Sequence, residues 1–74
     1  MAKTTLNLKG MSCPMPIMKI AAAAKKGASG DVFEAVSDDA GFEPDVIAWC
    51  KETGNKLDSL TKTGKDITVV ITKK

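Results

Sequence analysis

Residues 10–16, Gly-Met-Ser-Cys-Pro-Met-Pro, constrain the fold more than any other stretch of this chain. They separate a short alternation of polar and apolar residues from an alanine-rich helical pattern. Pro14 suits the first position of a helix, because its fixed φ is helical and its missing N–H has no intrahelical partner to lose. Ser12 or Cys13 would then be the N-cap. The stretch therefore predicts a junction where a strand ends and a helix begins.

The two segments that flank this junction have clear periodicities. Residues 4–8 alternate and predict a short strand with its leucines on one face. Residues 17–26 predict an amphipathic helix when 100° is counted for each residue. Gly27 or Gly30 is expected to end this helix. Its apolar arc consists of Ile17, Ile20, Ala21 and Ala24.

The middle of the chain repeats the alternation of strand and helix. Residues 31–37 are rich in β-branched and aromatic side chains, with apolar residues on both faces, which predicts a central strand. Pro44 is expected to open a second helix that runs to about Thr53, with Gly54 as its C-terminal stop. The same angular count predicts one apolar cluster on this helix, flanked by Trp49. The cluster consists of Val46, Ile47 and Cys50.

The last third predicts two strands joined by a turn at residues 62–65. Residues 67–72 alternate clearly, whereas residues 57–61 form a weaker pattern that indicates an edge strand. The order βαβαββ and a length of 74 residues leave too little chain to cover both faces of a sheet. We therefore predict one domain, residues 1–74, of the α/β class (α+β type). It is a two-layer sandwich with a four-stranded mixed sheet and two helices on one face.

Composition excludes several classes of function. The net charge is only +2, every basic residue is lysine and the aromatic residues number three, which disfavours direct nucleic-acid binding. No apolar run approaches the ~20 residues of a membrane span. The N-terminal residues lack the apolar core of a signal peptide, so a cytoplasmic location is expected. The chain has no histidine and two cysteines, so a Cys-His pair or a four-ligand zinc site cannot form from these residues alone. We expect no cofactor and no metal.

Cys13 is the candidate for chemistry. Free cysteine often packs as a small hydrophobe, which is one interpretation of Cys13. A helix start favours an anion, but the dipole contributes only about 0.3–1 kcal/mol. Pro14 and Pro16 also offer no N–H to a thiolate. The two prolines instead stiffen the helix entrance and fix where the sulfur points, which suits handing a group to a partner protein.

Cys50 has a different setting. It lies in the middle of the second predicted helix beside Trp49, and we expect it to be a core residue without a chemical role. A thiol-disulfide protein that uses Cys13 and Cys50 is a further hypothesis. The separation of 36 residues disfavours it, because redox pairs are usually Cys-x-x-Cys.

The sequence resembles the TusA/SirA-like family of small sulfur carriers. The resemblance is carried by Cys-Pro-x-Pro at residues 13–16, after a Leu-x-Leu-x-Gly lead-in at residues 6–10. Asp38-Asp39, Trp49-Cys50 and Thr53-Gly54 extend the match over nearly the whole chain. Many members have an arginine just before the motif cysteine, and this chain has serine there.

The resemblance implies a function for the motif. Cys13 would accept sulfane sulfur (or selenium) as a persulfide, with Pro14 and Pro16 as structural parts of the motif. The chain would act as a sulfurtransferase-type relay rather than as a stand-alone catalyst. Implied partners are a donor of the cysteine desulfurase or rhodanese type and an acceptor protein, for example a DsrE-like one. The pathway could be tRNA thiolation, cofactor synthesis or sulfur oxidation. The alternative hypothesis is a regulatory or adaptor module, not catalytic, in which Cys13 is merely packed.

Overall fold

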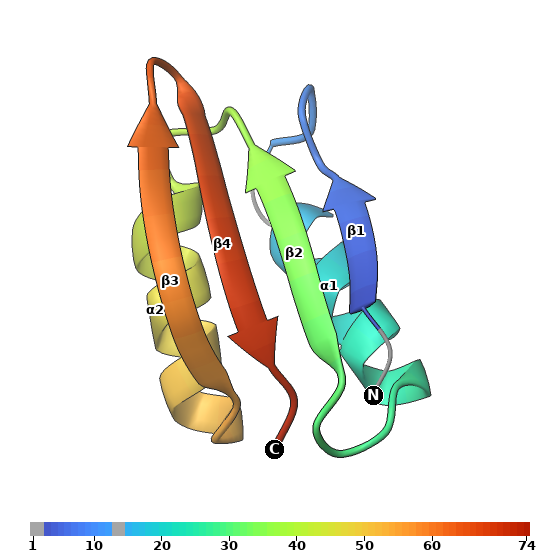
Figure 1. Cartoon of the computed structure of the whole chain (residues 1–74). Coiled ribbons are helices and arrows are strands. Elements are labelled where there is room, and N and C mark those ends of the chain that lie inside the picture. Colours follow the sequence, from blue (N-terminus) through green and yellow to red (C-terminus); the bar gives the residue numbers. More distant parts are fainter. Residues whose placement is uncertain (1–2, 13–14) are drawn as a thin grey trace.

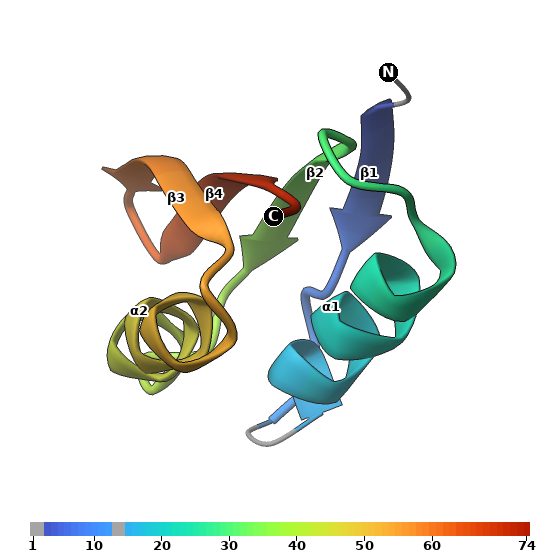
Figure 2. The ribbon, with the colours of Figure 1, turned by 90° about the horizontal axis from the view of Figure 1, so that it is seen from below.

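Four strands form one sheet, and two helices pack on the same face of it. The computed structural model describes residues 3–12 and 15–74. The elements are β1 (Lys3–Asn7), α1 (Met15–Lys26), β2 (Val32–Ser37), α2 (Phe42–Thr53), β3 (Lys56–Thr63) and β4 (Asp66–Thr72). The strand order is β1-β2-β4-β3, with β1 parallel to β2 and the other neighbouring pairs antiparallel. Figure 1 shows the sheet in front of both helices, and the view from below separates the two layers (Figure 2). The predicted two-layer sandwich of order βαβαββ is confirmed.

The core lies between the central strands and the two helices. Along β4 the apolar residues at alternate positions face the helices, and threonines and Val70 between them lie on the open face. β2 has the same alternation, and Phe33, Ala35 and Ser37 are its buried residues. β2 is a central strand, as predicted. The buried cluster comprises Leu8, Ile20, Ala35, Phe42, Val46, Cys50, Ile67, Val69 and Ile71.

Helix α1 buries one stripe and ends where its sequence predicts. Pro16, Ile20 and Ala24 are its buried residues, at the i, i+4, i+8 spacing of a single helix face. Ile17 and Ala21, from the predicted apolar arc, are half-buried beside this stripe. Gly27 follows the last helical residue, and a Cβ at this glycine would lie 2.7 Å from Cζ of Phe33. Glycine is therefore required here for close packing of the helix end on the sheet. Among the described residues, no helix is long and apolar enough to cross a bilayer.

Helix α2 begins two residues earlier than predicted. The N–H of Phe42 donates to the carbonyl of Asp39 at 3.0 Å, and Gly41 is the N-cap. Pro44 lies inside the first turn, where N–H groups have no intrahelical acceptor, so proline does not mark the helix start. The predicted end is confirmed, because Gly54 adopts a left-handed conformation (φ 79°) and its N–H donates to the carbonyl of Cys50.

The prediction that Ile47 joins the buried cluster of α2 is wrong. Ile47 is 44% exposed, whereas Phe42, Val46 and Cys50 are buried. These three residues are four apart and define the face that packs on the sheet. Ile47 lies 100° around the helix from Val46, outside that face. The early helix start therefore moves the buried stripe away from Ile47.

The β3–β4 hairpin is longer than its sequence pattern indicates. The two strands pair up to Thr63 and Asp66, so the turn consists of Gly64 and Lys65 only. Gly64 has φ 61°, a value that favours glycine in a tight hairpin turn. A register shift between Leu57 and Ser59 interrupts the ladder. β3 is an edge strand, as predicted.

Candidate functional site

The loop that precedes α1 lies at the edge of the sheet where β1 and β2 both end. We call residues 8–12 the motif loop; they are the described part of the chain between β1 and the Cys-Pro pair. Because β1 and β2 are parallel, the motif loop and the loop that follows β2 emerge side by side (Figure 1). The N–H of Leu8 donates to the carbonyl of Val36 at 2.8 Å, which extends the ladder one residue beyond β1. The side chain of Leu8 is buried in the core.

The motif loop begins with a tight turn. The N–H of Met11 donates to the carbonyl of Leu8 at 3.3 Å, an i to i+3 hydrogen bond. Gly10, the third residue of this turn, has φ 85°, which is the conformation that type II turns require of their third residue. No atom lies within 4 Å of a Cβ built on Gly10. Gly10 is therefore needed for its backbone conformation and not for space.

A carboxylate from the neighbouring loop holds this turn. The N–H of Gly10 donates to Oδ1 of Asp38 at 3.0 Å, although the two residues are 28 positions apart. Asp38 directly follows β2. The sequence identifies Asp38 only as part of the family pattern and indicates no role for it. The signal that could have found it is the parallel pairing of the first two strands, which places the ends of both at one edge.

Charged side chains of both signs surround the motif loop. The Lys9 ammonium lies 3.2 Å from Oδ2 of Asp66, at the start of β4, with both side chains well exposed. Lys62 and Glu43 form a second ion pair at this edge. Exposed ion pairs contribute about 0–1 kcal/mol each. Neither charge sign dominates here, so the edge has no field that would select a strongly charged small molecule.

The helix side of the motif is also defined. The N–H of Met15, the first residue of α1, donates to the carbonyl of Ser12 at 2.9 Å. Met15 is 43% exposed and Met18 is 56% exposed. The sequence of α1 contains no acidic residue. The start of α1 therefore presents two flexible apolar side chains to solvent, a kind of surface that adapts to more than one partner.

The predicted site residues fall partly outside the described chain. Cys13 and Pro14 lie outside the described residues. Pro16, predicted as a structural part of the motif, is in the first turn of α1 and its ring is fully buried. The described neighbours of the Cys-Pro pair are thus Ser12, which is exposed, and Met15.

Cys50 lies in the core, as predicted. Its side chain is 4% exposed and belongs to the buried cluster. Burial raises the pKa of the Cys50 thiol, because the interior disfavours the thiolate. A thiol in this state is a poor nucleophile. The hypothesis of a Cys13–Cys50 redox pair stays a prediction.

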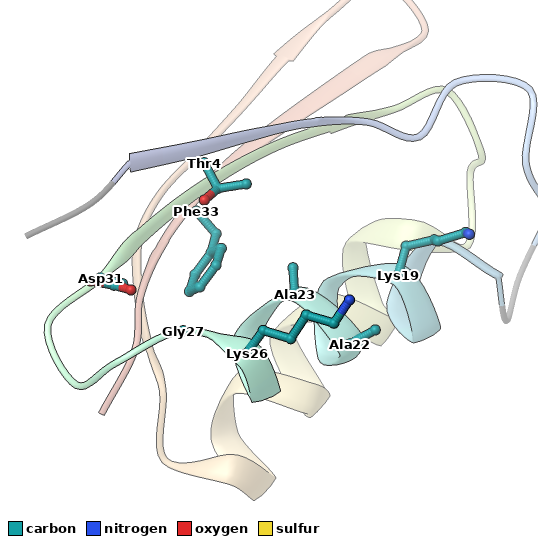
Figure 3. A pocket seen from close by; sticks show the side chains of 8 residues that line it. All are labelled: Thr4, Lys19, Ala22, Ala23, Lys26, Gly27, Asp31 and Phe33. Atoms are coloured by element: carbon teal, nitrogen blue, oxygen red, sulfur yellow. The ribbon is translucent and has the colours of Figure 1, made fainter.

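A cavity of about 490 Å³ lies beside α1, away from the motif loop. Figure 3 shows the ring of Phe33 between β1 and α1, with the ammonium groups of Lys19 and Lys26 near the opening. Neither lysine has a hydrogen-bond or ion-pair partner within residues 3–12 and 15–74. None of the residues that line the cavity belongs to the motif loop. The described part of the chain also holds no group of three His, Cys, Asp or Glu side chains that could bind a metal ion.

Comparisons with known proteins agree with this geometry. The family model described as Sulfurtransferase TusA matches residues 4–73. A proposed sulfur carrier protein of Aquifex aeolicus is 39% identical over 67 residues, which cover 89% of this chain. The chain spans 34% of that relative's length. The sulfur carrier protein TusA of Allochromatium vinosum is 35% identical over 52 residues, 70% of this chain and 68% of that protein.

A solved structure has the same fold. The SirA-like protein of Desulfitobacterium hafniense superimposes with a TM-score of 0.79 and 25% sequence identity, covering 97% of this chain and 96% of that one. The family model covers every described helix and almost all of every strand, together with the Cys-Pro-x-Pro motif at residues 13–16. This chain therefore belongs to the TusA family of sulfurtransferases.

Proposed function

We propose that this chain is a sulfur carrier that accepts sulfane sulfur as a persulfide on Cys13 and passes it to a partner protein. The observation that carries the proposal is the family match over residues 4–73, which includes Cys13 at the junction of strand and helix. The described residues on both sides of Cys13 are held by hydrogen bonds, and exposed methionines follow it. This arrangement supports presentation of a thiol to another protein.

The transfer is an exchange between sulfur atoms. The Cys13 thiolate attacks the outer sulfur of a donor persulfide, a new S–S bond forms, and the donor's S–S bond breaks. The donor leaves as a thiolate that takes up a proton, so no external oxidant or reductant is consumed. The same exchange in the opposite role moves the sulfur from Cys13 to an acceptor cysteine. Expected donors are a cysteine desulfurase or a rhodanese, and the acceptor is a protein thiol, for example on a DsrE-like protein.

Intact-mass measurement tests the proposal directly. The chain is incubated with a cysteine desulfurase and L-cysteine, and separately with a rhodanese and thiosulfate. We expect an added mass equal to one sulfur atom, removed by a reducing agent. Cys13→Ser should abolish the adduct and Cys50→Ser, the matched cysteine control, should retain it. An adduct that survives Cys13→Ser, or no adduct from either donor, would contradict the proposal.

The regulatory alternative makes a different prediction for the same protein. A packed Cys13 reacts slowly with a small alkylating reagent in the folded state, and quickly after denaturation. A presented Cys13 reacts at a rate close to that of the denatured chain. Comparison of these two rates in the Cys50→Ala background, which leaves Cys13 as the only thiol, separates the two hypotheses.

A further inference from the structure

We propose that Asp38 is a positioning residue for sulfur transfer, because its carboxylate fixes the motif loop that leads to Cys13. This inference rests on the proposed function. Its basis is the hydrogen bond from the N–H of Gly10 to Oδ1 of Asp38, at 3.0 Å. Asp38 does not act on the sulfur itself in this proposal; it acts through the backbone of Gly10.

The bond to Asp38 connects the backbone of the motif loop to the residue that directly follows β2, beyond the last bond of the sheet ladder. The last ladder bond in this direction joins the N–H of Leu8 to the carbonyl of Val36. After Leu8 the chain turns, and the bond from Met11 to Leu8 connects the turn only to itself. The side chain of Met11 packs against the core, and the carboxylate of Asp38 adds a polar restraint on how the turn is oriented relative to β2.

The other polar attachment at this edge, the ion pair of Lys9 with Asp66, is a weaker interaction. Lys9 reaches Asp66 through a long side chain, and the lysine and aspartate side chains are 46% and 39% exposed. Such pairs are screened by solvent and lose side-chain entropy when they form. The bond from Gly10 to Asp38 joins a backbone amide, which has no side-chain rotamers to lose, to a carboxylate, and hydrogen bonds to charged groups are stronger than neutral ones. Asp38 is therefore the stronger of the two polar attachments, and Lys9 is a suitable control.

Orientation of this loop matters because Cys13 is three residues beyond Gly10. On its other side, the hydrogen bond from Met15 to Ser12 attaches the same segment to α1. A loop that is already ordered loses less conformational entropy when a partner docks, and a misplaced reacting group slows a transfer steeply. A negative charge gives no stabilisation to a thiolate. The benefit of Asp38 must therefore come from the hydrogen bond and not from its charge.

Four variants separate the hydrogen bond from the charge and from the exposed ion pair. Asp38→Asn keeps the Oδ1 acceptor and loses the charge, whereas Asp38→Ala loses both. Asp39→Asn removes the same charge from the next residue and leaves the bond to Gly10 intact. Lys9→Ala removes the exposed ion pair. The measured quantity is kcat/KM for sulfur transfer to Cys13 from a cysteine desulfurase supplied with L-cysteine.

We expect kcat/KM for Asp38→Ala to fall about 2- to 12-fold below that of Asp38→Asn, the loss typical of one neutral hydrogen bond. Asp38→Asn should stay within about threefold of Asp39→Asn, and Lys9→Ala within about twofold of the wild type. Equal rates for Asp38→Ala and Asp38→Asn would overturn the inference. If both stay at the wild-type rate, Asp38 has no role, and if both fall equally, the charge is the cause.

A second measurement detects the hydrogen bond directly and needs no sulfur donor. Amide hydrogen exchange at Gly10, followed by NMR, should be faster in Asp38→Ala and near the wild-type rate in Asp38→Asn. Unchanged exchange in Asp38→Ala would overturn the inference. If Asp38→Ala unfolds, Asp38→Ser, whose side chain is one bond shorter, replaces it in both assays. A wild-type chain that takes up no sulfur overturns the proposed function, and this inference with it. If the wild type takes up sulfur and the two Asp38 variants react at equal rates, this inference is overturned and the proposed function is not.

Discussion

Replacement of the buried thiol of Cys50 tests whether water or a polar partner reaches the core of this protein. Cys50 is 4% exposed and lies on the inner face of α2 with Val46 and Phe42. Cys50→Ser changes one atom and keeps nearly the same shape, so the change in stability reports mainly the burial of a hydroxyl. Cys50→Ala removes the sulfur and adds no polar group.

The magnitude follows from the burial and from the helix. A hydroxyl buried without a partner costs about 1–3 kcal/mol in protein mutational data. In a helix interior, the serine hydroxyl can donate to the carbonyl four residues earlier, here that of Val46, which recovers part of the cost. We therefore expect Cys50→Ser to lower the free energy of unfolding by about 1–2 kcal/mol. That corresponds to a fall in Tm of about 4–16 °C for a domain of this size. Cys50→Ala should cost about 1 kcal/mol or less, because it loses roughly one methylene equivalent and gains helix propensity.

The assay is urea unfolding of the wild type, Cys50→Ser and Cys50→Ala, with Ala48→Ser as the matched control on the exposed face of α2. Ala48→Ser should cost only the helix propensity difference, about 0.5 kcal/mol. Stability of Cys50→Ser equal to or above that of Cys50→Ala would refute the reasoning, because it would mean that water or a polar partner reaches the site.

The same residue predicts a pH dependence. Burial raises the pKa of Cys50 in the folded state, so above the unfolded pKa of about 8.5 the unfolded chain binds fewer protons than the folded one. Stability due to this thiol is therefore complete below that pH and is lost as pH rises through the folded pKa. The advantage of the wild type over Cys50→Ala should shrink between pH 7 and alkaline pH. An advantage that grows with pH would contradict the assignment of Cys50 to the desolvated core.

Two further predictions concern helix α2, both measured by urea unfolding. Gly54→Ala should cost about 1–2 kcal/mol, because an L-residue is strained at the φ of 79° that ends the helix; the Lys74 side chain near the new Cβ is flexible and adds little. A neutral result would contradict the left-handed cap. Ile47→Ser should stay within about 0.5 kcal/mol, whereas Val46→Ala, at a fully buried position, should cost about 2 kcal/mol. A reversal of that order would mean that the buried stripe of α2 includes Ile47.

The sequence predicts which strands and helices form more accurately than it predicts which face of each one is buried. The order of strands and helices follows from the glycine and proline residues that mark the ends of these elements. In α2, by contrast, a helix predicted to open at Pro44 leaves only Val46, Ile47 and Cys50 to locate the buried stripe, because Phe42 precedes that start. Phe42 is one turn before Val46 and moves the centre of the stripe away from Ile47. Proline in the first turn is compatible with several helix starts, so Pro44 alone could not resolve this.

The alternating sequence pattern of strand β3 is weak for a physical reason. Leu57 and Leu60 both pack against the core, opposite Ile71 and Val69. An odd spacing places residues on opposite faces of a regular strand. The register shift after Leu57 restores Leu60 to the inner face. A pattern search that requires period two therefore underestimates this strand, and only the structure shows the irregularity.

The position of the candidate motif was predictable, but its attachment was not. A strand followed by two prolines and a helix placed Cys13 at the strand–helix junction, and the parallel pairing of the first two strands was expected from the crossover. That pairing brings the ends of both strands to one edge. The sequence does not distinguish Asp38 from Asp39 as the residue that bonds to Gly10, because this depends on the backbone of the short loop after β2. In the structure, the N–H of Asp39 donates to Oγ of the buried Ser37.

The two ends of the motif are held by the same core that stabilises the fold. On the strand side, Leu8 is buried within the main cluster, and on the helix side the ring of Pro16 is fully buried. Ser12 and Met15, between these two anchors, are exposed. A segment anchored at both ends by buried side chains cannot shift as a whole unless core contacts break. Ser12 and Met15 remain open to a docking protein. In a chain this small, changes that loosen the packing around Leu8 or Pro16 should therefore disturb the presentation of the motif before they unfold the protein.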